Sequence, residues 1–168
     1  RVSRRSEHNR LEAGYALGLL ATVGLLLLLS FHAEARVDTA SARERPRLTV
    51  DVTGSRWVWT FHYRDQRITE QSGFVGHGAL TVPTNQPVRF NLRSSDVIHS
   101  FWIPQLDYKR DLIPGTTERV TLDFDRAGWF GGGCAEFCGL HHAEMVFQVH
   151  AVTPAQFRAW AASHGGSR

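Results

Sequence analysis

Sulfur-containing residues are scarce in this sequence. Its 168 residues include two cysteines and one methionine, and all three lie between positions 134 and 145. Two cysteines are too few for the disulfide-dense framework of a small secreted domain. A single short disulfide between Cys134 and Cys138 is an alternative, but it leaves the histidines and the methionine beside them unexplained.

An excess of one charge sign is also missing from most of the chain. Residues 47–168 carry twelve Lys/Arg against eleven Asp/Glu, and residues 1–46 carry seven arginines against five acids. Nucleic-acid-binding domains normally show a clustered basic face. The nearly neutral second part therefore predicts no nucleic-acid partner.

Long apolar runs are absent, with one exception near the N-terminus. Residues 13–31 contain no charged residue and include five consecutive leucines. As a helix they are just long enough to cross a hydrocarbon core of about 30 Å. A cleaved signal peptide is the alternative. Four arginines before the run predict that its N-terminal end stays in the cytoplasm. They are Arg1, Arg4, Arg5 and Arg10.

The polar stretch after this run shows no periodicity and is expected to be a surface linker. We therefore expect four parts in the chain. They are a cytoplasmic segment at 1–12, a transmembrane helix at 13–33, a linker at 34–46 and a domain at 47–168. This order predicts a single-pass anchor in the plasma (inner) membrane, with the domain outside the cytoplasm on the periplasmic side.

Short β-rich runs with Gly, Pro, Asn or Asp between them fill the part after the linker. Their spacing favours a β-sandwich or Greek-key barrel over βαβ units. A C-terminal helix is expected after Thr153, a good N-cap, with Pro154 in its first turn and Phe157 and Trp160 on one face. The expected strands are 47–53, 56–63, 77–95, 118–124 and 145–152, and RAGWFGGG at 126–133 is expected to be a turn.

The stretch GGGCAEFCGLHHAEM at 131–145 combines thiol, imidazole and thioether groups. Such ligands select copper over magnesium or calcium, and a thioether disfavours structural zinc. A mononuclear blue-copper site uses one cysteine, and here there are two. Two thiolates four residues apart can instead lie between two metal ions, with one histidine for each ion. Met145 and a backbone carbonyl would complete the set, which leaves no open position and favours electron transfer over catalysis.

The spacing C-x-E-x-C-x₃-H-x₂-M resembles the CuA site of cytochrome c oxidase subunit II. Its members here are Cys134, Glu136, Cys138, His142 and Met145. Other segments fit the same family, and the resemblance covers residues 10–162. These segments are SSDVIHSFWIP at 94–104, which contains His99, then RWVWTFHY at 56–63, DLIPG at 111–115 and TPAQFRAW at 153–160.

The resemblance implies a mainly β, cupredoxin-like Greek-key fold and a subunit of a membrane haem-copper terminal oxidase. A dinuclear copper centre would accept electrons from cytochrome c or an equivalent carrier and pass them to haem in subunit I. That partner would reduce oxygen to water, coupled to proton translocation. The implied partners are subunit I, further oxidase subunits, the electron donor and membrane lipid, and haem is expected only in the partner.

The resemblance also assigns roles to residues. The implied copper ligands are the side chains of His99, Cys134, Cys138, His142 and Met145 and the carbonyl oxygen of Glu136. The Glu136 carboxylate would help to hold magnesium at the interface with subunit I. His141 falls outside the ligand spacing and is expected at the surface or beside the ligands. Trp57 resembles the aromatic residue that receives electrons from cytochrome c, whereas Trp59 is expected to pack in the core.

Three acids match family positions. Asp96 and Asp111 match acids near the catalytic subunit, although capping a turn is an equal alternative for each. Glu12 falls where the family often carries a glutamate near the entrance of a proton path. The W-T-x-x-P that typically follows that glutamate is replaced here by YALGLLA, and the family commonly has a second membrane helix.

Two other functions remain as alternatives. A membrane-anchored copper-delivery protein would also use C-x₃-C and a distant histidine, but usually on a thioredoxin-like fold with its cysteines early in the chain. A quinol-oxidising relative that has lost its copper would lack ligands that are all present here.

Overall fold

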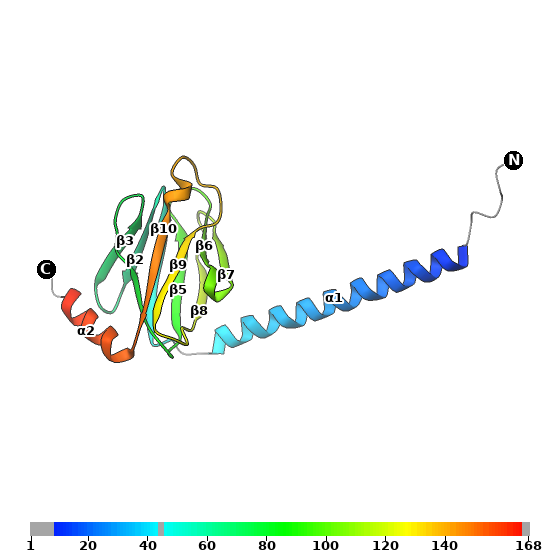
Figure 1. Cartoon of the computed structure of the whole chain (residues 1–168), viewed down its shortest axis with the longest axis horizontal. Helices are drawn as coiled ribbons and strands as arrows, with labels where there is room; N and C mark the ends of the chain where they lie inside the picture. Colours follow the sequence, from blue (N-terminus) through cyan, green and yellow to red (C-terminus); the bar gives the residue numbers. More distant parts are fainter. Residues whose placement is uncertain (1–8, 44–45, 166–168) are drawn as a thin grey trace. The chain divides into compact units, whose positions relative to one another are not determined.

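The computed structural model describes residues 9–43 and 46–165 and divides into an N-terminal and a C-terminal unit. The N-terminal unit contains one helix, α1 (Asn9–Arg43) (Figure 1). The most apolar 18-residue window of its segment Asn9–Glu34 has a mean hydropathy of 2.1 and no buried residue. Length and composition are those of a helix that can cross a membrane.

Helix α1 does not match the predicted boundaries. It begins at Asn9 and continues to Arg43, through most of the segment 34–46 that was expected to be a linker. Alanine, arginine and glutamate favour helix, and no glycine or proline occurs in this segment before Pro46. The absence of an apolar stripe therefore did not prevent helix formation. Most of the predicted cytoplasmic segment 1–12 lies outside the described residues.

The C-terminal unit is a sandwich of two five-stranded sheets (Figure 1). One sheet has the order β3-β2-β1-β5-β8, and the other has the order β4-β10-β9-β6-β7. The mainly β, cupredoxin-like fold expected from the sequence is confirmed. The strands are β1 (Leu48–Ser55), β2 (Val58–Tyr63), β3 (Ile68–Gly73), β4 (Leu80–Pro83), β5 (Val88–Ser94), β6 (His99–Ile103), β7 (Tyr108–Leu112), β8 (Glu118–Leu122), β9 (Gly128–Cys134) and β10 (Val146–Val152).

Aromatic side chains from both sheets fill the core. Alternate residues of β2, namely Trp59, Phe61 and Tyr63, are fully buried. From the other sheet, the rings of Phe101 and Phe147 stack with centroids 4.8 Å apart. Each fully buried side chain of this size stabilises the fold by roughly 1.5–3 kcal/mol. The sandwich therefore supplies a rigid frame for the loops at its ends.

Strand β9 corrects the prediction of a turn at 126–133. Its glycines lie in a strand that pairs with β10 along most of its length and with β6 at its end. A Cβ on Gly132 would overlap the ring of Phe147 in the core. The glycine is thus required by packing between strands, which a local pattern does not reveal. Strands β3, β6 and β7 were also missed, and 77–95 contains two strands.

The C-terminal helix α2 (Pro154–His164) begins as predicted. Thr153 accepts a hydrogen bond from the backbone of Gln156, whose side chain accepts one from the backbone of Thr153. This reciprocal capping box satisfies two backbone donors at the start of the helix. Phe157 is buried, and the ring of Trp160 lies 5.0 Å from that of Tyr63.

Candidate metal centre

The loop between β9 and β10 closes one end of the sandwich and carries both cysteines and the methionine (Figure 1). Cys134 ends β9, and Met145 directly precedes β10. The backbone N–H of Cys134 donates to the carbonyl oxygen of Met145 at 2.9 Å, which closes the loop at its base. Gly139 has a φ of +115°, a conformation that glycine adopts without strain. The chain then turns into the short helix η2 (His142–Glu144).

The two thiols lie next to each other, and a histidine flanks each of them. The Sγ atoms of Cys134 and Cys138 are 3.8 Å apart, and both cysteines are free. Nδ1 of His99 lies 3.7 Å from Sγ of Cys134, and Nδ1 of His142 lies 3.5 Å from Sγ of Cys138. Sδ of Met145 lies 3.7 Å from Sγ of Cys138. The donors therefore form two groups around a shared pair of sulfurs. His99 lies beside Cys134, and His142 and Met145 lie beside Cys138.

A backbone carbonyl joins the Cys134 side of the cluster. The thiol of Cys134 donates to the carbonyl oxygen of Glu136 at 3.2 Å, while the Glu136 residue itself is exposed. All six predicted ligands thus converge from one loop and the start of β6. A group that is compact enough for one ion, His99, Cys134 and Cys138, has its ligand atoms within 4.8 Å of one another.

His99 is fully buried and held from two sides. Oδ1 of Asp96 lies 2.9 Å from Nε2 of the ring, which fixes the ring so that Nδ1 faces Cys134. On β1, Gly54 leaves room for the ring, because a Cβ there would lie 3.1 Å from the nearest imidazole carbons. Gly54 was not identified from the sequence, because it lies between the predicted strands 47–53 and 56–63, where a glycine is typical of a turn. In the structure it lies inside β1, where it permits this close approach.

Asp96 both caps a turn and holds a predicted ligand. It accepts hydrogen bonds from the backbone N–H groups of Arg56 at 2.8 Å and Val97 at 2.7 Å, in addition to the contact with His99. Burial raises its pKa, but these hydrogen bonds outweigh burial and lower the pKa to about 2. The carboxylate is therefore ionised at neutral pH. The structure shows the turn-capping alternative for Asp96, and a role toward a catalytic subunit stays a prediction.

Asp111 makes its contacts within the sandwich. Its Oδ1 accepts a hydrogen bond from the hydroxyl of Ser100 at 2.7 Å and one from Nζ of Lys109 at 3.2 Å. The bond from Ser100 lowers the pKa of the carboxyl group more than burial raises it. The bond from Ser100 joins β6 to β7, whereas Lys109 lies on β7 with Asp111. A role for Asp111 toward a catalytic subunit stays a prediction.

The electrostatics of the cluster distinguish the two thiols. Burial raises the pKa of both. For Cys134 the hydrogen bond to His99 and further local hydrogen bonds outweigh burial and lower the pKa. For Cys138 the negative charge of Cys134 adds to burial, and the pKa is raised. Cys134 therefore ionises first, and a bound cation would be needed to stabilise both thiolates together.

Trp57 and Trp59 both donate to backbone carbonyls of the ligand loop. Trp57 is half-buried, and its Nε1–H donates to the carbonyl oxygen of Cys138 at 3.2 Å. Trp59 is fully buried, and its Nε1–H donates to the carbonyl oxygen of Met145 at 3.1 Å. The burial of Trp59 agrees with the prediction, but its hydrogen bond to the loop was missed.

His141 packs among aromatic side chains beside the ligands. Its ring centroid lies 4.7 Å from that of Trp57 and 3.9 Å from that of Phe74. Its Nδ1 lies 3.0 Å from Oε1 of Glu144, and its side chain is 26% exposed. Phe74 was given no role from the sequence, because it lies far from the ligand motif along the chain.

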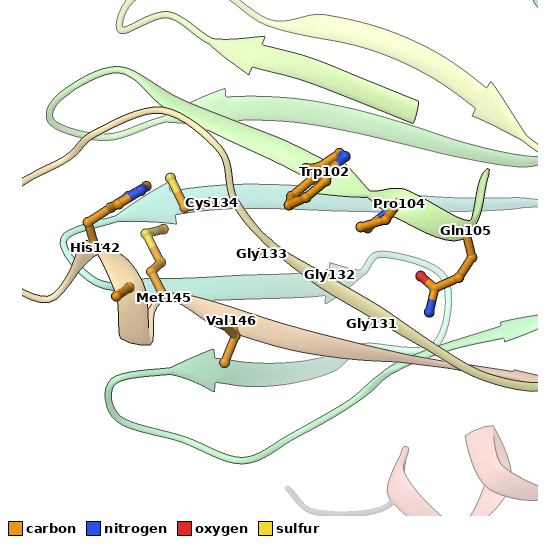
Figure 2. Close-up of a pocket in the computed structure, with 11 residues that line it drawn as sticks. Trp102, Pro104, Gln105, Gly131, Gly132, Gly133, Cys134, His142, Met145 and Val146 are labelled. Carbon is orange, nitrogen blue, oxygen red and sulfur yellow. The ribbon is translucent and has the colours of Figure 1, made fainter. Parts of the chain in front are cut away.

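A groove with a volume of about 300 Å³ opens beside the centre (Figure 2). Cys134, His142 and Met145 gather at one end of it, and Gln105 lies toward the other. Glycines 131–133 line it without side chains. The groove therefore reaches the half-buried Cys134 and His142, whereas Met145 behind them is fully buried. Glu12 lies in the first turn of α1, in the other unit, and its expected role stays a prediction.

A two-sheet β-sandwich with a Cys, His and Met loop at one end defines a cupredoxin-like domain with a candidate metal site. Residues 74–152 match the family described as cytochrome C oxidase subunit II, periplasmic domain. The domain belongs to the cytochrome c oxidase subunit II family, and the resemblance found in the motifs is confirmed.

Individual relatives agree with this family. The chain is similar to cytochrome c oxidase subunit 2 of Alkalihalophilus pseudofirmus, with 39% identity over 66% of this chain and 31% of that protein. It is 34% identical to the subunit of Bacillus sp. strain PS3, over 94% of this chain and 48% of that protein. The chain thus spans a third to a half of these curated relatives.

A solved structure shows the same domain. The periplasmic domain of subunit II of cytochrome oxidase (CoxB) of Bradyrhizobium japonicum is 28% identical, with a TM-score of 0.68. The match covers 71% of this chain and 94% of that chain. The fold of the C-terminal unit is therefore similar to that of a known subunit II domain.

Proposed function

We propose that this chain is the electron-accepting subunit of a membrane-bound haem-copper terminal oxidase. The observation that carries the proposal is the pair of free thiols 3.8 Å apart, each beside a different histidine. This arrangement offers shared ligands to two ions and a separate imidazole to each. Membership of the subunit II family supports the same conclusion.

The donor set fits copper. Thiolate, imidazole and thioether are soft or intermediate ligands, and together they favour copper over magnesium, calcium or manganese. A structural zinc ion takes four ligands in a tetrahedron. The six donors here, in two groups, are more than one such ion binds. The side chains of His99, Cys134, Cys138, His142 and Met145 and the carbonyl oxygen of Glu136 would hold two copper ions.

A dinuclear copper centre, when bound, supplies an acceptor and donor of one electron with little change of geometry. The chain contributes rigidity to this chemistry. His99 and Met145 are fully buried. Asp96 accepts a hydrogen bond from the ring of His99, and Trp59 donates one to the backbone carbonyl oxygen of Met145. Ligands fixed in this way hold one arrangement in both oxidation states, so little reorganisation accompanies each transfer. Trp57 provides a surface aromatic next to the loop, where we place the arrival of electrons.

The proposed role extends to other chains and to the membrane. Helix α1 would anchor the domain outside the cytoplasm, and the electron donor would be cytochrome c or an equivalent carrier. Electrons would pass to haem in subunit I, where oxygen is reduced to water with proton translocation. The exposed Glu136 carboxylate would bind magnesium at the interface with that subunit, and Glu12 would lie near a proton path.

A copper-delivery protein is the second candidate for the same ligands. Its usual scaffold is thioredoxin-like, with helices on a mixed sheet, whereas the C-terminal unit here is a two-sheet β-sandwich. A carrier also has to release its metal, and a cluster with a fully buried histidine and methionine is poorly suited to release. The fold and the burial therefore favour the oxidase subunit.

Metal analysis tests this proposal directly. The full chain in detergent is reduced, loaded with copper and freed of excess metal. Two coppers per chain and an EPR spectrum of one electron shared between two copper nuclei are expected. One copper per folded chain, or the spectrum of a single copper, would contradict the dinuclear centre. Copper delivery would then be the better-supported function.

A further inference from the structure

His141 belongs to an aromatic cluster that joins three separate segments of the domain. Its ring stacks on Phe74 with an interplanar angle of 23°, and it meets Trp57 edge to face at 77°. Trp57 and Phe74 also contact each other edge to face, with centroids 6.5 Å apart. Since both His141 contacts are shorter than this, its ring lies against both aromatics.

Trp57 is the member of this cluster next to the ligand loop. Its indole nitrogen donates to the carbonyl oxygen of Cys138. The indole also lies against Gly139, where a Cβ would be 3.4 Å from the ring. A single hydrogen bond fixes the position of the nitrogen but lets the half-exposed indole tilt about it. The closest aromatic contact on the ring, from His141 at 4.7 Å between centroids, restricts that tilt.

The outer side of the cluster is fixed by the backbone. The N–H of Phe74 donates to the carbonyl oxygen of Trp57 at 3.0 Å. Gly73 has a φ of +129°, and a Cβ there would lie 2.5 Å from the same carbonyl oxygen. Only glycine permits this approach. Phe74 therefore keeps a defined place over the ring of His141.

Glu144 orients the histidine ring within the cluster. Oε1 of Glu144 lies 3.0 Å from Nδ1 of His141, and the backbone N–H of Glu144 donates to the carbonyl oxygen of His141 at 3.1 Å. The ring is thus held by stacking on one face and by a hydrogen bond at one edge. Such a double restraint exceeds what a surface histidine requires.

We propose that His141 is a positioning residue for electron transfer, which holds the indole of Trp57 against the ligand loop. The inference rests on the proposed function, since it assigns Trp57 as the place where electrons arrive. Electron tunnelling falls steeply with distance and depends on the path, so a tilted indole lengthens the route to Cys138. His141 itself contributes no metal ligand and accepts no electron.

Reduction kinetics of the copper-loaded full chain in detergent test this role. His141→Ala should slow reduction by a reduced c-type cytochrome by about ten-fold, as for other small misplacements of a reacting group. Copper content, the visible spectrum and the midpoint potential should stay unchanged. Reduction by dithionite, a small reagent that does not require Trp57, should keep its rate. His141→Phe keeps the stacked ring and should restore most of the rate with cytochrome.

A double-mutant cycle separates positioning from a general structural effect. In a Trp57→Gln chain, adding His141→Ala should slow the cytochrome reaction no further, because there is no indole left to hold. His150→Ala is the matched control, since it removes a histidine stacked on Trp129 elsewhere in the domain. That variant should reduce at the normal rate.

Three results would overturn the inference. The first is that His141→Ala is reduced by the cytochrome at the normal rate. The second is that His141→Ala slows this reduction equally in chains with Trp57 and in the Trp57→Gln chain, and the third is that His141→Ala loses copper. If the loaded wild-type chain takes no electrons from any cytochrome, the proposed function fails. Hydrogen exchange of the Trp57 indole proton, measured by NMR in the reduced protein, then decides the positioning role alone. Exchange no faster in His141→Ala than in wild type would contradict it.

Discussion

Gly54 lies directly against the imidazole of His99, and a Cβ at position 54 would be 3.1 Å from two carbons of the ring. Carbon atoms in ordinary contact lie about 3.5–4.0 Å apart. The ring cannot retreat freely, because Asp96 holds its Nε2 and Cys134 lies at its Nδ1. A glycine in the first sheet thus sets the position of a ligand in the second.

Gly54→Ala should therefore disturb the metal centre on the side of His99. The added methyl group should displace His99 by a few tenths of an ångström and lower the free energy of unfolding by about 1–3 kcal/mol, a typical result of overpacking. The visible and EPR spectra should shift, and copper should be lost more readily to a chelator. Gly131→Ala is the control, because its nearest neighbour would lie 3.8 Å away. Unchanged spectra in Gly54→Ala would show that the contact does not constrain the ligand.

The shared sulfurs predict a second result. Cys138→Ser removes the sulfur that contacts Cys134, His142 and Met145, so the remaining donors cannot bridge two ions. We expect at most one copper per chain and loss of the signal from the delocalised pair, measured by metal analysis and EPR. His141→Ala provides the comparison and should retain both coppers. A two-copper centre in Cys138→Ser would remove Cys138 from the set of bridging ligands.

Two neighbouring tryptophans should respond differently to substitution. Trp57→Gln should slow reduction by an external cytochrome by about ten-fold or more, while copper content and melting temperature stay nearly unchanged, since Trp57 is only half-buried. Trp59→Phe removes a buried hydrogen bond to Met145 and should cost about 1–3 kcal/mol of stability. Stopped-flow kinetics and thermal melts of both variants distinguish the two roles. A normal reduction rate with a lower melting temperature in Trp57→Gln would show that Trp57 is a packing residue and not the place where electrons arrive.

The sequence predicted those features of the site that depend on short spacing. Cys134, Cys138, His142 and Met145 lie in one loop, so their order along the chain is sufficient to show that they can meet. His99 stood out as a candidate thirty-five residues before Cys134, but its assignment as a ligand came from the family resemblance, because its contact with Cys134 crosses from β6 to the loop. The alternation of apolar residues likewise predicted a β-sandwich, but it did not predict which strands pair with each other.

Features that depend on contacts between distant segments were missed. Strand β9 was mistaken for a turn, because the need for glycine at 132 comes from Phe147 on the neighbouring strand. The His141 and Phe74 stack joins two loops that no local pattern connects. Gly54 was overlooked for the same reason. Each error concerns a residue whose type is decided by a tertiary neighbour and not by its own segment.

Asp51 carries a final prediction, on the outer face of the first sheet. Its carboxylate accepts hydrogen bonds from Nε of Arg64 at 2.6 Å and from the side-chain amide of Asn91 at 2.7 Å, and Arg93 lies 3.8 Å away. Burial raises the pKa of this carboxyl group, but the hydrogen bonds and the two arginines outweigh burial and lower it below 3.8. The ionised form is thus stabilised by folding.

The sign of the pH dependence follows from this lowered pKa. A group whose pKa is lower in the folded state contributes its full stability above the unfolded value of 3.8 and loses it as the pH falls through the folded value. Asp51→Asn should cost about 1–2 kcal/mol at pH 7, since charged hydrogen bonds are worth somewhat more than neutral ones. The difference from wild type should persist to about pH 5 and shrink below pH 4. Denaturant melts of the metal-free, reduced chain at each pH measure it, with the exposed Asp125→Asn as control. A difference that grew toward acid would mean that Asp51 is destabilised by folding, and the assignment of its partners would be wrong.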